Sequence, residues 1–429
     1  MTSTNYKPSN IVRLVWPGGR AEEAELISIG KAGGAGEVFN IAGKPHHVAK
    51  LYHATTRDEQ LRQYERKIRW MMGNKPDLPE IPASQHDIVQ LAWPVAMVRR
   101  GSKFAGFVME KIDFDRTMEL DYLLTRRQAA EEGFEVDFGK LVTVCCNLAS
   151  LLNCLHAKKI AVVDLKPINL KVYKSELYVS IMDCDGFHIY ADGFESEAPQ
   201  ITPEYLAPEF QDRAVTLPEA QDRFALATII FRLLNYGIHP YTGIAANHYP
   251  YPPELAGRIK HGLYAYGKSR HEHVRAAPAS VHECFPEELR NMFDRAFTHA
   301  AGGRASAYEW AVLLSAFANR SAGRMATCEK GHLQFLGKSC PTCLREAILT
   351  GHVARQQRFI TQIQASPARA IRYVQKTIRG THTSPFQAAL AQQQIAMPQL
   401  APTQGTIRNS IAVEILWIAG LLISYWWLK

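Results

Sequence analysis

The stretch AVVDLKPINLKVY, residues 161–173, brings an acid, a base and an amide together within six residues. Asp164, Lys166 and Asn169 lie in a short polar loop between apolar segments typical of β-strands. A carboxylate can accept a hydroxyl proton, an ammonium group can neutralise a moving phosphoryl group, and an amide oxygen can ligate Mg²⁺. The spacing therefore predicts a loop that binds a nucleotide and its metal, with Asp164 and Lys166 as the catalytic residues.

A second acidic segment follows at YVSIMDCDGF, residues 178–187. An apolar strand runs directly into Asp183, whose carboxylate is predicted to bind, together with Asn169, a Mg²⁺ ion that bridges the β- and γ-phosphates. The alternative metal ligand is Asp185, which begins Asp-Gly-Phe. We favour Asp183 because its distance from Asn169 along the chain fits this role better.

Upstream, the segment IGKAGGAGEVF follows one predicted strand and precedes another. Glycines leave backbone N–H groups uncovered, so phosphate oxygens can approach them closely, although a plain β-turn is an equally simple explanation. In the next strand, HHVAKLYH, a lysine suits contact with the α- and β-phosphates. The predicted nucleotide-binding residues of this region are Gly30, Gly33, Gly34, Gly36, Val38 and Lys50.

A helix predicted from about Thr56 to Met72 interrupts these strands and offers a carboxylate to hold Lys50. Glu65 is the expected partner of Lys50, and Glu59 is the alternative. Either residue is also explained as an ordinary exposed helical charge.

In their order along the chain, VAK, DLKPIN, IMDCD, TPEYLAPEF, DRFALATIIFRLL and GRASAYEW resemble the signature segments of protein kinases over residues 25–318. The DLKPIN form is similar to the Ser/Thr type. The resemblance implies phosphoryl transfer from ATP to a protein substrate, with Mg²⁺ as cofactor. It further implies adenine binding along Met109, Glu110 and Ile112.

The chain also departs from that pattern. Val162-Val163 replaces the usual His-Arg before the catalytic aspartate, and Cys184-Asp185 replaces the usual Phe-Gly after the metal aspartate. A nucleotide-binding pseudokinase scaffold is therefore the alternative function. The segment DCDGF together with a zinc-type tail is similar to a bacterial kinase branch associated with PP2C-type phosphatases and von Willebrand factor A proteins, which are the implied partners.

A cysteine-rich segment, CEKGHLQFLGKSCPTC, follows at residues 328–343. Two short knuckles that flank a hairpin suit tetrahedral Zn²⁺, whereas a redox-active Cys-x-x-Cys is the alternative. The predicted ligands are Cys328, His332, Cys340 and Cys343, with His332 as the fourth ligand beside the three cysteines. We expect a structural role for the metal.

Charge and hydropathy suggest how the remainder is used. The formal net charge is +8, but residues 347–413 contain no acid and seven basic residues, so the rest is near neutral and a nucleic-acid partner is not expected.

Residues 411–428 are apolar except for Glu414 and just long enough to cross a bilayer, whereas a buried or dimerising helix is the alternative. The N-terminus has no signal-peptide core. We expect a single-pass protein of the inner (cell) membrane with its catalytic part in the cytoplasm.

The expected fold class is α+β, a two-lobed protein-kinase-like fold with an antiparallel strand-rich N-lobe, a helical C-lobe, a small zinc ribbon and a C-terminal transmembrane helix. The expected divisions are the N-lobe at 1–112, the C-lobe at 113–320, the zinc ribbon at 324–348, a basic linker at 349–410 and the transmembrane helix at 411–428.

Overall fold

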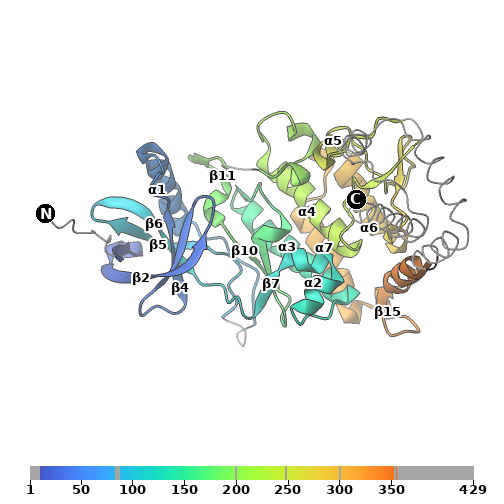
Figure 1. The fold of residues 1–429 in the computed structure, drawn as a ribbon, viewed down its shortest axis with the longest axis horizontal. Coiled ribbons are helices and arrows are strands. Elements are labelled where there is room, and N and C mark those ends of the chain that lie inside the picture. The colour runs from blue at the N-terminus through green and yellow to red at the C-terminus, as the bar shows by residue number, and fades with distance from the viewer. Residues whose placement is uncertain are drawn as a thin grey trace, which may run out of the picture. The chain divides into compact units, whose positions relative to one another are not determined.

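A computed structural model describes residues 10–82, 87–198, 201–246, 249–298, 301–351 and 354 of the chain. Residues up to Gly351 form one compact unit, to which the description below refers (Figure 1). Most of the predicted linker and all of the predicted transmembrane segment at 411–428 lie outside the described residues.

The N-terminal region is a closed antiparallel barrel with the strand order β1-β2-β3-β4-β6-β5. Along β1, buried and exposed residues alternate, so one face of the strand packs inside the barrel. Leu14 and Val98 come together in the barrel core because β1 pairs with β5 as well as with β2. The strands are β1 (Ile11–Val15), β2 (Ala21–Ala32), β3 (Gly36–Ile41), β4 (His47–Tyr52), β5 (Pro94–Arg100) and β6 (Lys103–Glu110).

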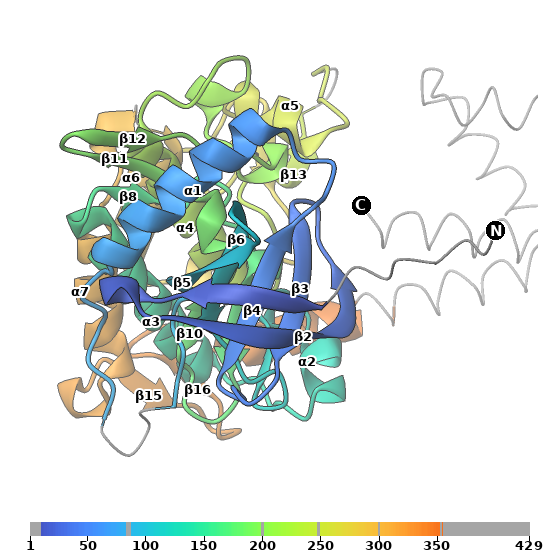
Figure 2. The same cartoon turned by 90° about the vertical axis from the view of Figure 1, so that its left-hand side faces the viewer.

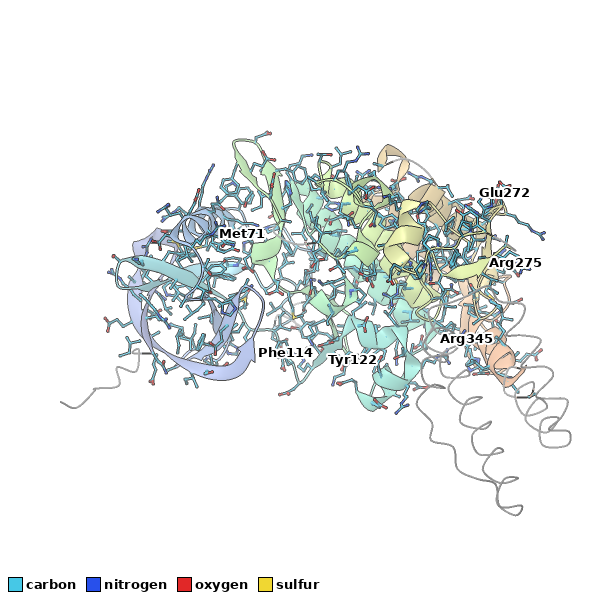
Figure 3. The ribbon with its side chains drawn as sticks, turned by 45° about the horizontal axis from the view of Figure 1, so that its top comes forward. Met71, Phe114, Tyr122, Glu272, Arg275 and Arg345 are labelled. Atoms are coloured by element: carbon cyan, nitrogen blue, oxygen red, sulfur yellow. The ribbon has the colours of Figure 1, made fainter. Side chains whose placement is uncertain are left out.

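One helix, α1 (Asp58–Gly73), is inserted between β4 and β5, close to the predicted span. It lies across the barrel and beside β11 (His188–Ala191) and β12 (Phe194–Ser196), as Figure 2 shows. Met71, labelled in Figure 3, is fully buried, while the Trp70 ring stacks on Phe194 of β12 with centroids 5.2 Å apart. Helix α1 therefore connects the barrel to a segment that follows the catalytic loop.

The rest of the unit is mainly helical. Two of its helices, α3 (Phe138–Ala157) and α4 (Pro218–Leu234), are largely buried and pack against each other. Phe231 of α4 lies among Phe285, Phe293 and Phe297, with edge-to-face rings typical of stable aromatic clusters. The other helices are α2 (Arg126–Glu131), α5 (Leu255–Lys260), α6 (Glu287–Thr298) and α7 (Ala307–Ala318).

Helix α3 is long and apolar enough to cross a membrane by length and composition, and in the described part of the chain it is the one helix that is. In its most apolar 18-residue stretch, α3 is 61% buried inside the unit, as is usual for the core helix of a globular protein.

Short strand pairs connect these helices. β7 (Thr117–Glu119), β9 (Leu170–Tyr173) and β10 (Val179–Ile181) form one small sheet, and β8 (Ile160–Ala161) joins β11 and β12 in another. β13 (Gly243–Ala245) pairs with β14 (Val274–Ala276), and β15 (Met325–Thr327) pairs with β16 (Leu333–Phe335). The expected α+β class, with a strand-rich N-terminal part and a helical C-terminal part, is confirmed.

Candidate functional site

Asp164 sits in the loop between β8 and β9 and is held from several sides. Its Oδ2 lies 2.7 Å from Lys166 Nζ, and its Oδ1 accepts hydrogen bonds from the Thr202 amide at 2.9 Å and the Thr202 hydroxyl at 2.7 Å. Lys166 also donates to Thr202 Oγ1 at 2.8 Å, and Asn169 Nδ2 donates to the Asp164 carbonyl at 3.2 Å. The structure therefore brings Asp164, Lys166 and Asn169 together, as their spacing predicts.

Asp222 of the buried helix α4 holds this loop through hydrogen bonds to its backbone. Its two carboxylate oxygens accept the amides of Val162 and Val163, each at 2.7 Å, and His156 Nε2 lies 3.0 Å from Oδ2. Val163 has a φ of 63°, an unfavourable conformation for a β-branched residue. The charge-assisted hydrogen bonds that these amides donate to Asp222 hold the strained backbone and so fix the direction in which the Asp164 side chain points.

Close packing of backbones brings Lys50 into the site. Lys50 pairs with Val38 of β3 on one side and with Phe107 of β6 on the other. A Cβ on Gly36 would lie 2.1 Å from the Leu51 carbonyl oxygen, and a Cβ on Gly106 would lie 1.9 Å from the Lys50 carbonyl oxygen. Glycine is therefore required on both strands that flank Lys50.

The predicted phosphate loop connects β2 to β3. Gly30 has a φ of 67°, and the Gly33 amide donates to the Gly36 carbonyl at 2.8 Å. A Cβ on Gly34 would meet nothing within 4 Å, so the loop backbone is open on that side. This exposure fits a role in approaching an anionic group, and it equally fits a tight hairpin turn.

Lys50 Nζ contacts two carboxylates from the segment after β10. It lies 3.2 Å from Asp183 Oδ1 and 2.8 Å from Asp185 Oδ1. Burial alone would lower the pKa of Lys50, but Asp185 and Asp183 outweigh burial and hold the pKa above its usual value. The Asp183 side chain is 65% exposed and its backbone is left-handed, with a φ of 53°. Much of the Asp183 side chain is therefore open to solvent. The Met182 amide donates to the Asn169 carbonyl at 3.0 Å, which ties the residue before Asp183 to the catalytic loop.

Helix α1 does not supply the carboxylate at Lys50. Glu65 instead pairs with Arg69 at 3.0 Å and with Arg99 of β5, and Glu59 is exposed in the first turn of the helix. The side chain of α1 that reaches the segment after β10 is Lys67, which is buried and donates to the Phe187 carbonyl. Burial lowers the pKa of Lys67 to about 8, and nearby Asp185 offsets part of this effect.

The residues predicted to bind adenine lie where the barrel joins the helical part. Met109 and Glu110 end β6, and Ile112 follows in the connection and is buried. The Lys111 amide donates to the His46 carbonyl at 2.9 Å, and Glu110 Oε2 accepts from Lys75 at 3.2 Å. This segment is therefore held at its backbone beside β4, the strand that carries Lys50.

A hollow of about 300 Å³ opens beside Lys166. Its lining includes Ile168, Glu204, Arg232 and His239. Ile168 is exposed, whereas burial, with help from Arg232, lowers the pKa of His239 to about 3, so that its ring is neutral at pH 7. His239 Nε2 lies 3.1 Å from the Glu204 carbonyl oxygen, which fixes one wall of the hollow.

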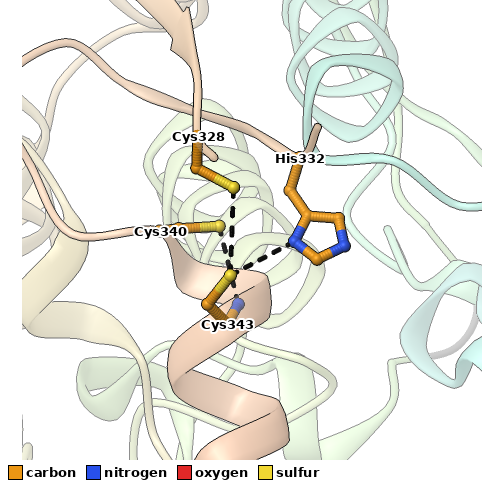
Figure 4. Close-up of side chains that lie close together, drawn as sticks. All are labelled: Cys328, His332, Cys340 and Cys343. Carbon is orange, nitrogen blue, oxygen red and sulfur yellow. Dashed lines mark hydrogen bonds between the residues drawn. The ribbon is translucent and has the colours of Figure 1, made fainter. Parts of the chain in front are cut away.

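The cysteine-rich segment forms a second site (Figure 4). The ligand atoms of Cys328, His332, Cys340 and Cys343 all lie within 4.8 Å of one another. The Sγ atoms of Cys328 and Cys343 are 3.8 Å apart, too far for a disulfide bond but equal to the spacing of about 3.8 Å between two sulfurs held 2.3 Å from a tetrahedral zinc. His332 Nδ1 lies 3.3 Å from Cys343 Sγ, so the histidine belongs to the cluster. The donor set fits structural Zn²⁺.

The hairpin that carries this cluster packs into the helical part. Phe335 of β16 is 1% exposed, and its ring centroid lies 4.9 Å from that of Phe317 and 5.3 Å from that of Phe138. In the helix over 341–351, Thr342 accepts a hydrogen bond from Arg126 at 2.9 Å, and Arg345, labelled in Figure 3, donates to the Ala279 carbonyl at 2.6 Å. The cysteine cluster therefore lies on a hairpin whose aromatic side chain is part of the main core.

The chain is similar to two curated proteins, both named Protein kinase YegI. It is 29% identical over 312 residues to the protein from Escherichia coli strain K12, covering 68% of this chain and 44% of that protein. The protein from Escherichia coli O157:H7 is 29% identical over 301 residues, covering 66% of this chain and 43% of the relative. The chain therefore spans less than half the length of these relatives, of which it is a distant homologue. No family model matches the chain.

Sequence reasoning did not assign Thr202, Lys67 or Gly106 to the site, and it considered Asp185 only as a possible metal ligand. Thr202 is the first residue of TPEYLAPEF, one of the segments that resemble protein-kinase signatures, and this was the available signal for it. Lys67 precedes Ile68 and lies four residues before Met71 within the apolar pattern of its helix, but a long basic side chain beside such a pattern usually reaches water.

Loss of metal from the cysteine cluster should destabilise the whole unit. We expect about one zinc per purified chain, and we expect Cys340→Ser to lose it. Release of Phe335 from its core contacts should then lower the free energy of unfolding by about 3–5 kcal/mol, the usual cost of removing a buried phenylalanine from a core. Metal analysis and equilibrium urea unfolding measure the two effects. Cys154→Ser, a half-buried cysteine outside the cluster, is the control, and absence of zinc from reduced, chelator-free wild type would contradict the assignment.

Lys67 should make stability depend on pH in the alkaline range. Its pKa is about 8 in the folded chain, below its usual value of 10.5, so the unfolded chain binds more protons between these values. The free energy of unfolding contributed by Lys67 should therefore rise from pH 8 to 10.5. Urea unfolding of wild type and Lys67→Met across this range should show a difference that grows in favour of wild type. Lys103→Met, which removes an exposed ammonium, is the control; a constant difference for Lys67→Met would show that its ammonium is not buried.

Proposed function

We propose that the chain is a Ser/Thr protein kinase that transfers the γ-phosphoryl group of ATP to a protein substrate. The observation that carries this proposal is the convergence of Asp164, Lys166 and Asn169 with the Lys50–Asp183 pair, from segments more than 100 residues apart. The barrel followed by a helical part, and the distant homology to Protein kinase YegI, support the two-lobed kinase architecture.

The residues at this site suit nucleotide and metal. Lys50 and the open backbone around Gly33 and Gly34 would bind the phosphates, and Met109 to Ile112 would bind adenine. Asp183, with its exposed carboxylate, and Asn169 would hold Mg²⁺, which supplies neutralisation of the phosphate charge.

Asp164 and Lys166 would carry out the transfer. Asp164 Oδ1 already accepts one hydroxyl, that of Thr202, and would orient a substrate hydroxyl and accept its proton. Lys166, 2.7 Å from the other carboxylate oxygen, would neutralise the transferred group. The hollow lined by Ile168 and Arg232 adjoins these residues and would receive part of the protein substrate.

Two variants separate binding from chemistry. With Mg-ATP, the full-length chain should label itself or a general protein substrate on Ser or Thr. Asp164→Asn should keep nucleotide affinity but lower transfer by about 10²–10⁴-fold, the usual contribution of a general base. Asp183→Asn should weaken Mg-ATP binding as well, because an amide is a poorer ligand for Mg²⁺ than a carboxylate.

Phosphoryl transfer is measured with labelled ATP, and affinity by calorimetry. Asp212→Asn, which removes an exposed partner of Lys260, is the matched control. If wild type binds Mg-ATP but transfers no more than Asp164→Asn across several substrates, the pseudokinase scaffold becomes the better explanation.

We further propose that the chain is attached to the inner (cell) membrane through residues 411–428, with its catalytic part in the cytoplasm. The apolar run and the acid-free basic segment before it support this, since cytoplasmic basic flanks orient a spanning helix. A PP2C-type phosphatase and a von Willebrand factor A protein are proposed partners, based only on resemblance of DCDGF and the cysteine-rich tail to that kinase branch.

Membrane attachment has its own test. The full-length chain should stay with membranes after carbonate and high-salt washing, because hydrophobic burial resists both treatments. A chain that ends at Ser410 should be released, at most with salt-sensitive binding through its basic residues. Recovery of the full-length chain in the washed supernatant would rule out a spanning helix.

A further inference from the structure

A buried polar cluster lies between the barrel, helix α1 and the segment after β10. Lys50 and Tyr52 come from β4, Lys67 comes from α1, and Asp185 follows β10. Lys50, Lys67 and Asp185 are each no more than 6% exposed. Charged groups this deeply buried persist only when they are paired or hydrogen-bonded, so each must have a defined partner.

Both carboxylate oxygens of Asp185 are used inside the cluster. Oδ1 lies 2.8 Å from Lys50 Nζ, and Oδ2 accepts a hydrogen bond from the Tyr52 hydroxyl at 3.2 Å. Burial and the Asp185 charge raise the pKa of Tyr52 well above its usual value, so the hydroxyl keeps its proton and acts as a donor. By contrast, the Asp183 side chain is 65% exposed and has one contact with Lys50 at 3.2 Å. The two aspartates are therefore suited to different tasks.

The geometry of α1 explains why Asp185 is needed. Glu65 of α1 is paired with Arg69 and Arg99, and the residue that α1 directs to this region is the cation Lys67. A second cation near Lys50 cannot hold it in place, whereas Asp185 can. Lys67 binds the Phe187 carbonyl, two residues beyond Asp185, and so fixes the backbone that presents this carboxylate.

We propose that Asp185 is a positioning residue that holds Lys50 for phosphate binding in place of a carboxylate from helix α1, while Asp183 is left for Mg²⁺. This inference rests on the proposed function for its nucleotide part. It also implies that the lysine is aligned by the segment after β10, so that the path of residues 183–187, and not the position of a glutamate on α1, determines whether Lys50 is ready to bind.

A double-mutant cycle on the full-length chain tests this. The variants are Lys50→Met, Asp185→Asn and the two combined, with Mg-ATP as the probe for affinity and thermal unfolding without nucleotide as the second measurement. Tyr52→Phe serves as a milder variant that weakens the hold on Asp185 and leaves both charges in place. Glu119→Gln, which removes the partner of Lys171 at 3.2 Å, is the matched control for loss of a carboxylate.

Asp185→Asn should weaken Mg-ATP binding by about tenfold, the size expected when one hydrogen bond to a charged group is lost. Because Asp185 acts through Lys50, the combined variant should bind no more weakly than Lys50→Met alone. The Mg²⁺ concentration for half-maximal binding at fixed ATP should change in Asp183→Asn and stay near the wild-type value in Asp185→Asn. In unfolding, the combined variant should melt at a higher temperature than Lys50→Met, which leaves the Asp185 carboxylate buried without its cation. Tyr52→Phe should lower affinity less than Asp185→Asn.

Three results would overturn the inference. These are additive losses of affinity in the cycle, a Mg²⁺ dependence altered as strongly by Asp185→Asn as by Asp183→Asn, or a loss of affinity in Glu65→Gln that Asp185→Asn does not show. If wild type bound Mg-ATP and any of these were found, only this inference would fail. If wild type bound no Mg-ATP, the proposed function would fail together with it.

Discussion

The pairing of Lys50 with Asp185 is the interaction on which the arrangement of the site depends. It joins the middle of the barrel to a segment 135 residues later, and it does so in an environment from which water is largely removed. An unpaired charge there would cost several kcal/mol, so the barrel and the segment after β10 must adopt compatible positions or lose the pair. The glycines Gly36 and Gly106 let both neighbouring strands pack closely against the backbone of β4, the strand that carries Lys50.

A buried carboxylate also holds the catalytic loop, but here it binds backbone amides, whereas Asp185 binds the side chain of Lys50. Asp222 accepts two amides from the strained turn at Val162 and Val163, and that turn determines where Asp164 points. The two devices are linked, since the Met182 amide donates to the Asn169 carbonyl and so ties the segment of Asp183 to the catalytic loop. Lys50, Asp183, Asn169 and Asp164 are thus positioned by one continuous set of hydrogen bonds.

Much of this could be predicted from sequence because it is local. Asp164, Lys166 and Asn169 fall within six residues, and their convergence needs only a short turn; likewise the helix near residues 58–73 follows from its apolar period. The partner of Lys50 could not be predicted in the same way, because helical spacing alone makes Glu65 a reasonable candidate. Which face of α1 meets the barrel is decided by tertiary packing, which turns Glu65 toward Arg99 and Lys67 toward Phe187. Closure of the barrel through β1 and β5 is likewise a pairing of residues more than 80 positions apart, which leaves no local signal.

The hairpin that carries the cysteine cluster is likewise held in place by contacts with distant parts of the chain. A hairpin as short as β15–β16 cannot bury enough apolar surface to be stable alone, so it depends on packing against the core, and a metal held by its four ligand residues would add a second restraint. Phe335 provides the packing against the core, since its ring contacts Phe138 at the start of α3 and Phe317 near the end of α7. Helix α3 also contacts β10, the strand that leads to Asp183, and ends just before the catalytic loop. The core around α3 is therefore the physical connection between the cysteine cluster and the loop that carries Asp164.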